Sequence, residues 1–184
     1  MVRNLLLATA TSVLLLSGCV GSGTSSGAGT ADSSATTNSQ EDKEERNKKT
    51  VMASMEAMTK GDVDAMLKDA APDAVDYNDG SMPPMKISDS LKGMIKQFMT
   101  AFPDYKVNNA EYFADGNKVL VYYECSGTWK NDMMGMKATG KPFTQRDVEI
   151  FTFNDEGKVT EHRSVQSMGT MMAQIGAVPP PPEK

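Results

Sequence analysis

The residues best suited to chemistry lie near the C-terminal end of the chain, where two glutamates and an arginine occur on neighbouring segments. A carboxylate such as Glu149 or Glu161 that is surrounded by aromatic side chains has a raised pKa and can act as a general acid or base. Arg163 would then bind an anionic or enolate-like group of a ligand. Alternatively, Arg163 only neutralises a glutamate in a crowded interior, because buried charges need partners. A catalytic and a structural interpretation are therefore both open.

The composition argues against several other kinds of chemistry. One histidine and two cysteines are too few for a multi-histidine metal centre, a thiolate-rich zinc site or a disulfide framework. The net charge of −5 argues against binding to phosphate backbones, so we expect no nucleic-acid partner. Met133, Met134 and Met136 form a cluster of the kind that binds monovalent copper. Most other methionines occur at helical spacing, where they fill a core, so we predict no metal and no cofactor.

Two periodicities indicate the elements that must position these residues. Before Pro103 apolar residues recur at intervals of three and four, which predicts helices, and after it the period changes to two, which predicts strands. The predicted helices span 41–60, a short segment after Asp62, a segment from Ser88 or Asp89 to Pro103, and 168–175; the predicted strands span 105–113, 118–129, 143–153 and 158–165. This order predicts an α+β domain in which N-terminal helices pack on a curved antiparallel sheet and enclose a cone-shaped pocket.

The N-terminal segment has the features of a bacterial export signal. Arg3 is followed by an apolar run from Leu5 to Leu16, shorter than the about 20 residues that span a bilayer as a helix. The run ends in Leu-Ser-Gly-Cys at 16–19, which resembles the lipobox of bacterial lipoproteins. The resemblance implies cleavage before Cys19 and lipidation of its thiol, which would anchor the protein in a membrane of the cell envelope, facing the periplasm or the exterior. An ordinary secretory signal with a chance cysteine is the alternative.

The remaining chain divides into a linker, a domain and a tail. Residues 19–40 are rich in Gly, Ser, Thr and Ala and are predicted to form a flexible tether. Residues 41–178 carry the periodic signal of one domain, and 179–184 form a proline-rich tail. Once Cys19 is lipidated, Cys125 is the remaining free thiol, which we expect to be buried and inert.

Several short motifs of the domain occur in the order found in one protein family. They are MEAMTKGDVD at 55–64, AAPDAVD at 70–76, AFPD at 101–104, GTW at 127–129 with Gly135 and TGKP at 139–142, GKVTEH at 157–162 and QIG at 174–176. With these motifs the chain resembles the SnoaL-like group of the nuclear transport factor 2-like superfamily. The resemblance implies the fold predicted above and a first pocket strand entered at 70–76. Its members include acid–base polyketide cyclases, hydrolases and isomerases, so the fold alone assigns no reaction.

The chain departs from the cyclase-like members at the positions that carry their chemistry. Those members commonly have histidine after the position of Asp76 and after the Gly-Thr pair, where this chain has Tyr77 and Trp129. Their closing strand carries a tryptophan and, four residues later, the acid–base aspartate, where this chain has Arg163 and Ser167. Serine does not exchange protons near neutral pH as a tuned carboxylate does. We therefore do not expect the cyclase mechanism as the family performs it.

Strand alternation together with the resemblance predicts which side chains face the pocket. The inward set is Tyr123, Cys125 and Trp129 on the second strand, Asp147, Glu149, Phe151 and Phe153 on the third, and Glu161, Arg163 and Val165 on the fourth. His162 has the opposite parity and is expected to face outward or toward the helices. The candidate ligand-binding residues are Tyr77, Tyr123, Trp129, Asp147, Phe151, Arg163 and Ser167, and the candidate catalytic residues are Glu149 and Glu161.

Three hypotheses about function follow. The first is a lipid-anchored protein that binds a small apolar or amphipathic molecule in its pocket without catalysis. The second is an acid–base enzyme of the cyclase, isomerase or hydrolase type that uses a pocket glutamate. The third is an interaction module that forms a homodimer through the open face of its sheet. The expected partners are accordingly the bilayer, an unidentified small molecule and a second copy of the chain.

Overall fold

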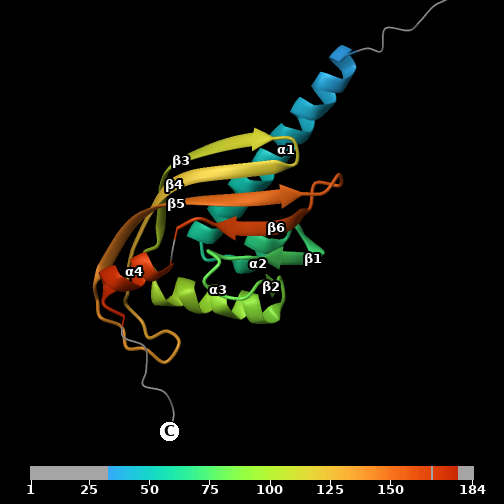
Figure 1. Ribbon diagram of the computed structural model, residues 1–184. Coiled ribbons are helices and arrows are strands. Elements are labelled where there is room, and N and C mark those ends of the chain that lie inside the picture. Colours follow the sequence, from blue (N-terminus) through green and yellow to red (C-terminus); the bar gives the residue numbers. More distant parts are fainter. Residues whose placement is uncertain (1–32, 167, 178–184) are drawn as a thin grey trace, which may run out of the picture. The chain divides into compact units, whose positions relative to one another are not determined.

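The computed structural model of the protein describes residues 33–166 and 168–177, with side chains from residue 39 onward. Helices and strands alternate in the first half and strands dominate the second (Figure 1). The elements are α1 (Ser33–Thr59), α2 (Val63–Leu67), β1 (Ala70–Asp76), β2 (Met85–Lys86), α3 (Asp89–Ala101), β3 (Lys106–Asp115), β4 (Lys118–Thr128), β5 (Pro142–Phe153), β6 (Val159–Ser164) and α4 (Met168–Ile175). The predicted α+β class and the helices and long strands of the domain are confirmed.

The strands form one sheet in the order β2-β1-β6-β5-β4-β3. The strands from β3 to β6 pair antiparallel with their neighbours, as predicted. The turn at 115–117 joins β3 to β4, and the turn at 155–157 joins β5 to β6. The sheet differs from the wholly antiparallel prediction at its other edge, where β1 pairs parallel to β6. The periodicity did not predict β1, because Pro72 and polar residues interrupt its alternation; the family resemblance did.

The first helix begins earlier than its apolar pattern. It starts at Ser33 rather than at residue 41, so the end of the predicted tether is helical. Its other end is fixed by Gly61, whose φ of +71° lies in the left-handed region that favours glycine. The backbone N–H of Gly61 donates to the carbonyl of Met58 at 2.9 Å. Asp62 then caps α2 by accepting from the N–H of Ala65 at 3.0 Å.

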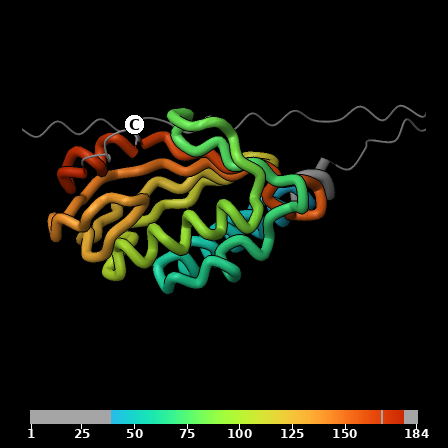
Figure 2. Tube along the Cα trace, turned by 90° about the horizontal axis from the view of Figure 1, so that it is seen from below, coloured from blue at the N-terminus to red at the C-terminus, as the bar shows by residue number. Residues whose placement is uncertain are grey.

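The helices pack on one face of the sheet and enclose the core (Figure 2). Val51, Met55 and Met58 form the buried stripe of α1, whereas Met52, predicted to share it, is 49% exposed. The sheet contributes the alternating residues of β4 and β5 to the same cluster. The fully buried aromatic members are Trp129, Tyr123, Phe102 and Phe143.

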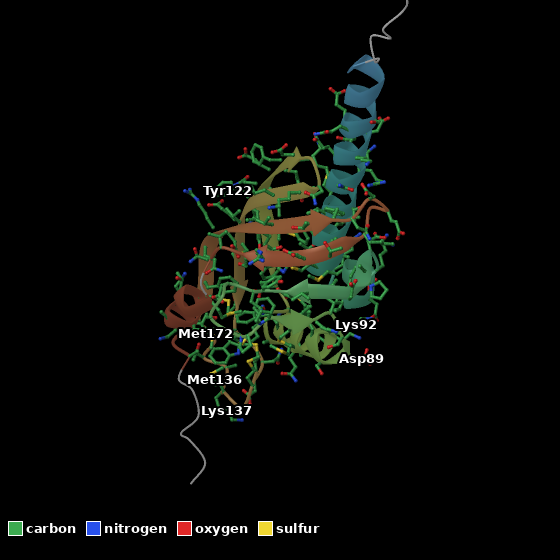
Figure 3. All side chains as sticks on the ribbon, turned by 45° about the vertical axis from the view of Figure 1, so that its right-hand side comes forward. Asp89, Lys92, Tyr122, Met136, Lys137 and Met172 are labelled. Atoms are coloured by element: carbon green, nitrogen blue, oxygen red, sulfur yellow. The ribbon has the colours of Figure 1, made fainter. Side chains whose placement is uncertain are left out.

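The loop between β4 and β5 and helix α4 cover the same end of the sheet. Figure 3 shows Met136 of the loop and Met172 of α4 near each other at this end, with Tyr122 of β4 away from them in the upper part of the view. Met133 and Met136 bond to each other through their backbones and are both buried, but Met134 between them is 51% exposed. Met133 and Met136 therefore belong to the core, whereas Met134 is half exposed.

Some predictions fall outside the described part of the chain. These are the signal segment, Cys19, the first part of the tether, Ser167 and the proline-rich tail. Within the described residues no helix has the length and apolar character required to cross a membrane.

Candidate functional site

A cavity of about 350 Å³ lies between the inner face of the sheet and the helices. Most of its lining is apolar and comes from α1, α2, α3 and α4. Ten of the fifteen methionines of the chain contribute to it. They are Met58, Met66, Met82, Met94, Met99, Met133, Met134, Met168, Met171 and Met172. An apolar cavity of this kind binds small organic molecules when a few polar groups are set in its walls.

The polar groups come from the sheet and gather on one wall. Tyr123 on β4, Asp147 and Glu149 on β5 and His162 on β6 line the cavity, and Asp76 at the end of β1 joins them. Asp147 and Glu149 are two residues apart on one face of β5, and Tyr123 lies opposite Asp147 on β4. The sheet thus places three carboxyl groups, a phenol and an imidazole in an apolar cavity.

His162 faces the cavity, so the prediction that it points outward or toward the helices is wrong. A β-bulge between β5 and β6 is the physical reason. Near the turn Phe153 lies opposite Val159, but beyond the irregularity Phe151 lies opposite His162. One extra residue in a strand exchanges its two faces. The inward Phe151 therefore has His162 beside it, with ring centres 4.9 Å apart.

The same bulge turns Glu161 and Arg163 away from the cavity, which corrects their predicted inward placement. Their side chains are 41% and 47% exposed, and Arg163 Nη2 lies 3.4 Å from Glu161 Oε2. The guanidinium of Arg163 stacks on the Tyr77 ring at 3.9 Å from its centre. Val165, predicted to share their inward face, is also exposed. Tyr77, Glu161 and Arg163 form an outer cluster rather than part of the cavity lining.

His162 is held between two carboxylates. Its Nδ1 lies 3.0 Å from Asp76 Oδ1, and its Nε2 lies 3.4 Å from Glu149 Oε2. Burial would lower the pKa of the imidazole, but the hydrogen bonds and charges of Asp76 and Glu149 raise it to about 10. For Asp76, burial would raise the pKa, but the hydrogen bond and charge of His162 lower it. His162 is therefore an imidazolium at neutral pH, and both of its N–H groups donate to carboxylates.

The other carboxylate oxygen of Glu149 also has a hydrogen-bond partner. Tyr123 donates its hydroxyl to Glu149 Oε1 at 2.6 Å. Burial and the nearby charge of Glu149 raise the pKa of Tyr123, which stays a phenol. With Tyr123 on one oxygen and His162 on the other, Glu149 orients both of these side chains.

The pKa of Asp147 is shifted in the opposite direction to that of Asp76. Its oxygens accept from the N–H of Gln166 at 3.0 Å and from the hydroxyl of Ser164 at 3.0 and 3.1 Å. Burial raises the pKa of Asp147, and the negative charge of Glu149 raises it further, although these hydrogen bonds act in the other direction. Asp147 is therefore a carboxyl of this wall whose pKa is raised, as is typical of groups that exchange protons in active sites.

The remaining predicted residues separate into two groups. Tyr123, Asp147, Glu149 and Phe151 lie together in the cavity lining, and Cys125 lies with them as a buried thiol whose pKa burial raises to about 11. Trp129 is fully buried and donates its Nε1–H to the Asn131 carbonyl at 2.8 Å, but it does not line the cavity.

Sequence reasoning missed several polar lining residues, including four that lie beside the carboxyl groups of the sheet or in the loop after β1. Asn78, Gln145, His162 and Ser164 all contribute polar atoms to the wall. Gln145 was predictable, because it precedes Asp147 by two residues on the same face of β5. His162 and Ser164 were hidden by the bulge, and Asn78 lies in a loop for which no periodicity applies. No group of three or more His, Cys, Asp or Glu side chains in the described part of the chain is arranged to hold a metal ion.

Comparison with known proteins gives the chain a family context. The SnoaL-like polyketide cyclase family matches residues 49–175. AclR from Streptomyces galilaeus, named as a candidate hydroxylase, is 25% identical, with a TM-score of 0.62 over 72% of this chain and 97% of that one. IdmH from Streptomyces antibioticus, named as a candidate polyketide cyclase, is 28% identical, with a TM-score of 0.56 over 71% and 98% of the two chains.

A third structure supports the fold alone. A protein from Jannaschia sp. CCS1, whose name assigns it to the SnoaL-like type, is 21% identical, with a TM-score of 0.65 over 74% of this chain and 95% of that one. No curated protein sequence matches the chain.

Proposed function

Because the chain belongs to the SnoaL-like polyketide cyclase family, we propose that its domain binds a small, mostly apolar carbonyl compound and transfers a proton at the carbon beside the carbonyl. The observation that carries the proposal is the polar wall of an otherwise apolar cavity, in which Asp147 has a raised pKa next to the fixed Glu149–His162 pair. Candidate cyclase activity in IdmH is consistent with this reaction class. In this proposal Asp147 is the acid–base residue, the role for which the sequence analysis named Glu149 or Glu161.

The chemistry requires a base and a group that stabilises negative charge. An oxygen of Asp147 takes the proton from the carbon, the electron pair of the broken C–H bond forms a C=C bond to the carbonyl carbon, and the π pair of the C=O bond moves onto the oxygen, giving an enolate. The imidazolium of His162 is paired with Asp76 and Glu149 and offsets part of their negative charge beside the developing enolate. Return of the proton from Asp147 to the original or a neighbouring carbon completes an exchange or an isomerisation, and attack of the enolate on a second carbonyl would complete a ring closure.

The experiment is deuterium exchange at the activated methylene of para-hydroxyphenylacetone in D₂O, followed by proton NMR with the full chain. We expect the wild-type protein to accelerate exchange and Asp147→Asn to lower the protein-dependent rate by about 10²- to 10⁴-fold. Because the base must be deprotonated, the rate should rise with pH through the raised pKa of Asp147.

The matched control is Asp155→Asn, at a side chain that is 97% exposed, and it should leave the rate unchanged. Circular dichroism would show that Asp147→Asn is folded. Equal rates for wild type and Asp147→Asn, with both folded, would contradict the proposal.

Binding without turnover is the second candidate. It is favoured by Ser167, which occupies the position where the resemblance places the family's acid–base aspartate. A wild-type protein that binds the ketone but does not accelerate exchange would support this candidate. In either case we propose that the domain is attached to an envelope membrane through lipidated Cys19.

A further inference from the structure

Two amide side chains in the cavity wall each have a buried polar atom without a hydrogen-bond partner. They are Nδ2 of Asn78 and Oε1 of Gln145, and both residues line the cavity. No other buried side-chain nitrogen or oxygen in the described part of the chain lacks a partner. Because an unsatisfied buried polar group costs free energy, a pair of them in one binding wall points to partners supplied by the ligand.

Asn78 is held firmly in place by its backbone. Its φ of +49° is in the left-handed region, which asparagine tolerates better than most residues. Its N–H donates to Asp76 Oδ1 at 2.8 Å, and its carbonyl accepts from the N–H of Ser164 at 2.9 Å. Since the hydroxyl of Ser164 donates to Asp147, Asn78 is connected through one residue to the proposed base. Its free N–H group is suited to a carbonyl oxygen.

Gln145 offers the complementary group. It lies directly opposite Cys125 across β4 and β5, and its side-chain amide acts to lower the pKa of the Cys125 thiol against the larger effect of burial. The Oε1 atom of Gln145 has no hydrogen-bond partner and is an acceptor available to a ligand. Gln145 and Asp147 share one face of β5. A hydroxyl group of a ligand is the donor that fits this position.

The charges that the sheet contributes to the cavity disfavour an anionic ligand beside Asn78 and Gln145, although Lys68 also lines the cavity. Asp76, Asp147 and Glu149 contribute carboxyl groups, and the imidazolium of His162 is already paired with two of them. A ligand carboxylate or phosphate would therefore meet uncompensated negative charge away from water. A neutral molecule is favoured.

We propose that Asn78 and Gln145 select a neutral hydroxy-carbonyl compound, with the carbonyl oxygen bound by Asn78 Nδ2 and the hydroxyl by Gln145 Oε1. This inference rests on the proposed function, because it assumes that the same cavity is the reaction site. It adds the substrate class and two specificity-determining residues. The hydrogen bond from Asn78 would also hold the oxygen on which negative charge develops.

The test compares three ligands by isothermal titration calorimetry with the full chain. The probes are para-hydroxyphenylacetone, phenylacetone, which lacks the hydroxyl, and para-propylphenol, which lacks the carbonyl. Wild type should bind the first about tenfold or more tightly than either of the others, because each analogue leaves one buried amide unpaired. Para-hydroxyphenylacetate, which adds a carboxylate, should bind most weakly.

The variants assign each preference to one residue. Asn78→Gly, which tolerates the positive φ, should abolish the preference for para-hydroxyphenylacetone over para-propylphenol and retain the preference over phenylacetone. Gln145→Met should do the reverse. Asn109→Gly is the matched control, since Asn109 also has a positive φ, of +52°, but bonds to exposed Glu124 outside the cavity lining.

Equal binding of the three ligands by wild type, or preferences that survive both variants, would overturn the inference. Its failure is distinguishable from that of the proposed function. Exchange that depends on Asp147 without ligand selectivity would remove only the specificity assignment, whereas selectivity without exchange would leave the assignment of the binding groups and remove the reaction.

Discussion

At the scale of single residues, the electrostatics of the site depend on His162 and its two carboxylate partners. His162 lies between Asp76 and Glu149, and their combined effect outweighs the burial of the ring and raises its pKa to about 10. At neutral pH His162 is therefore protonated because of its two carboxylate partners. Because the chain has one histidine, its titration is open to direct measurement.

We expect the ring protons of His162 to show no titration midpoint between pH 6 and 8 in proton NMR of the native protein. Glu149→Gln removes one of the two negative partners and should lower the midpoint. Tyr77→Phe, on the outer face, is the control and should not. A wild-type midpoint near 6.5, the ordinary value for histidine, would contradict the arrangement.

The raised pKa of His162 also predicts how stability depends on pH. A group whose pKa is higher in the folded state than in the unfolded state contributes stability that is fully present below the unfolded value and is lost as pH rises through the folded value. The stability from His162 should therefore fall between about pH 6.5 and 10. Urea unfolding across this window should show a smaller decline for His162→Gln than for wild type; parallel declines would contradict the linkage.

At the scale of elements, the register of β6 separates what the sequence predicts from what it does not. A period of two identifies which residues share a face, and it correctly grouped Tyr123 with Cys125 and Asp147 with Phe151. It does not locate a bulge, because the extra residue in β6 interrupts the pairing with β5 without a signal of its own in the sequence. The faces of β6 were therefore exchanged in the prediction, and the loop residue Asn78 had no periodic signal.

The turn before β6 is also tied to α1, and its glycine gives a test of that contact. Gly157 and Gly116 both have positive φ, of +78° and +58°, but an added Cβ at Gly157 would meet the Arg46 guanidinium at 2.7 to 2.8 Å, whereas at Gly116 it would meet open space. Gly116→Ala should cost about 1 kcal/mol of unfolding free energy from backbone strain alone, and Gly157→Ala should cost more.

Urea denaturation measures both variants. In an Arg46→Ala background the excess cost of Gly157→Ala over Gly116→Ala should disappear, because the side chain that the new methyl group meets is gone. An excess that persists without Arg46 would place its origin elsewhere.

At the scale of the whole molecule, the fold was predictable because its helices and long strands each carry a strong period, and the family resemblance supplied β1. The location of the protein rests on a different kind of signal, the sequence at 16–19. We expect Cys19→Ala to shift the protein from the membrane to the soluble fraction of its native host, measured by immunoblot after fractionation. Ser25→Ala in the predicted tether is the control. Continued membrane fractionation of Cys19→Ala would contradict the lipid anchor.

The ten methionines of the cavity lining have a consequence for which molecules the domain accepts. Their unbranched side chains change rotamer at little cost and repack around differently shaped guests. The strands, by contrast, hold the amide, carboxyl and imidazole groups in one fixed pattern. If the domain binds ligands as proposed, we therefore expect it to accept compounds with dissimilar hydrocarbon skeletons, provided that their oxygen atoms have the same arrangement.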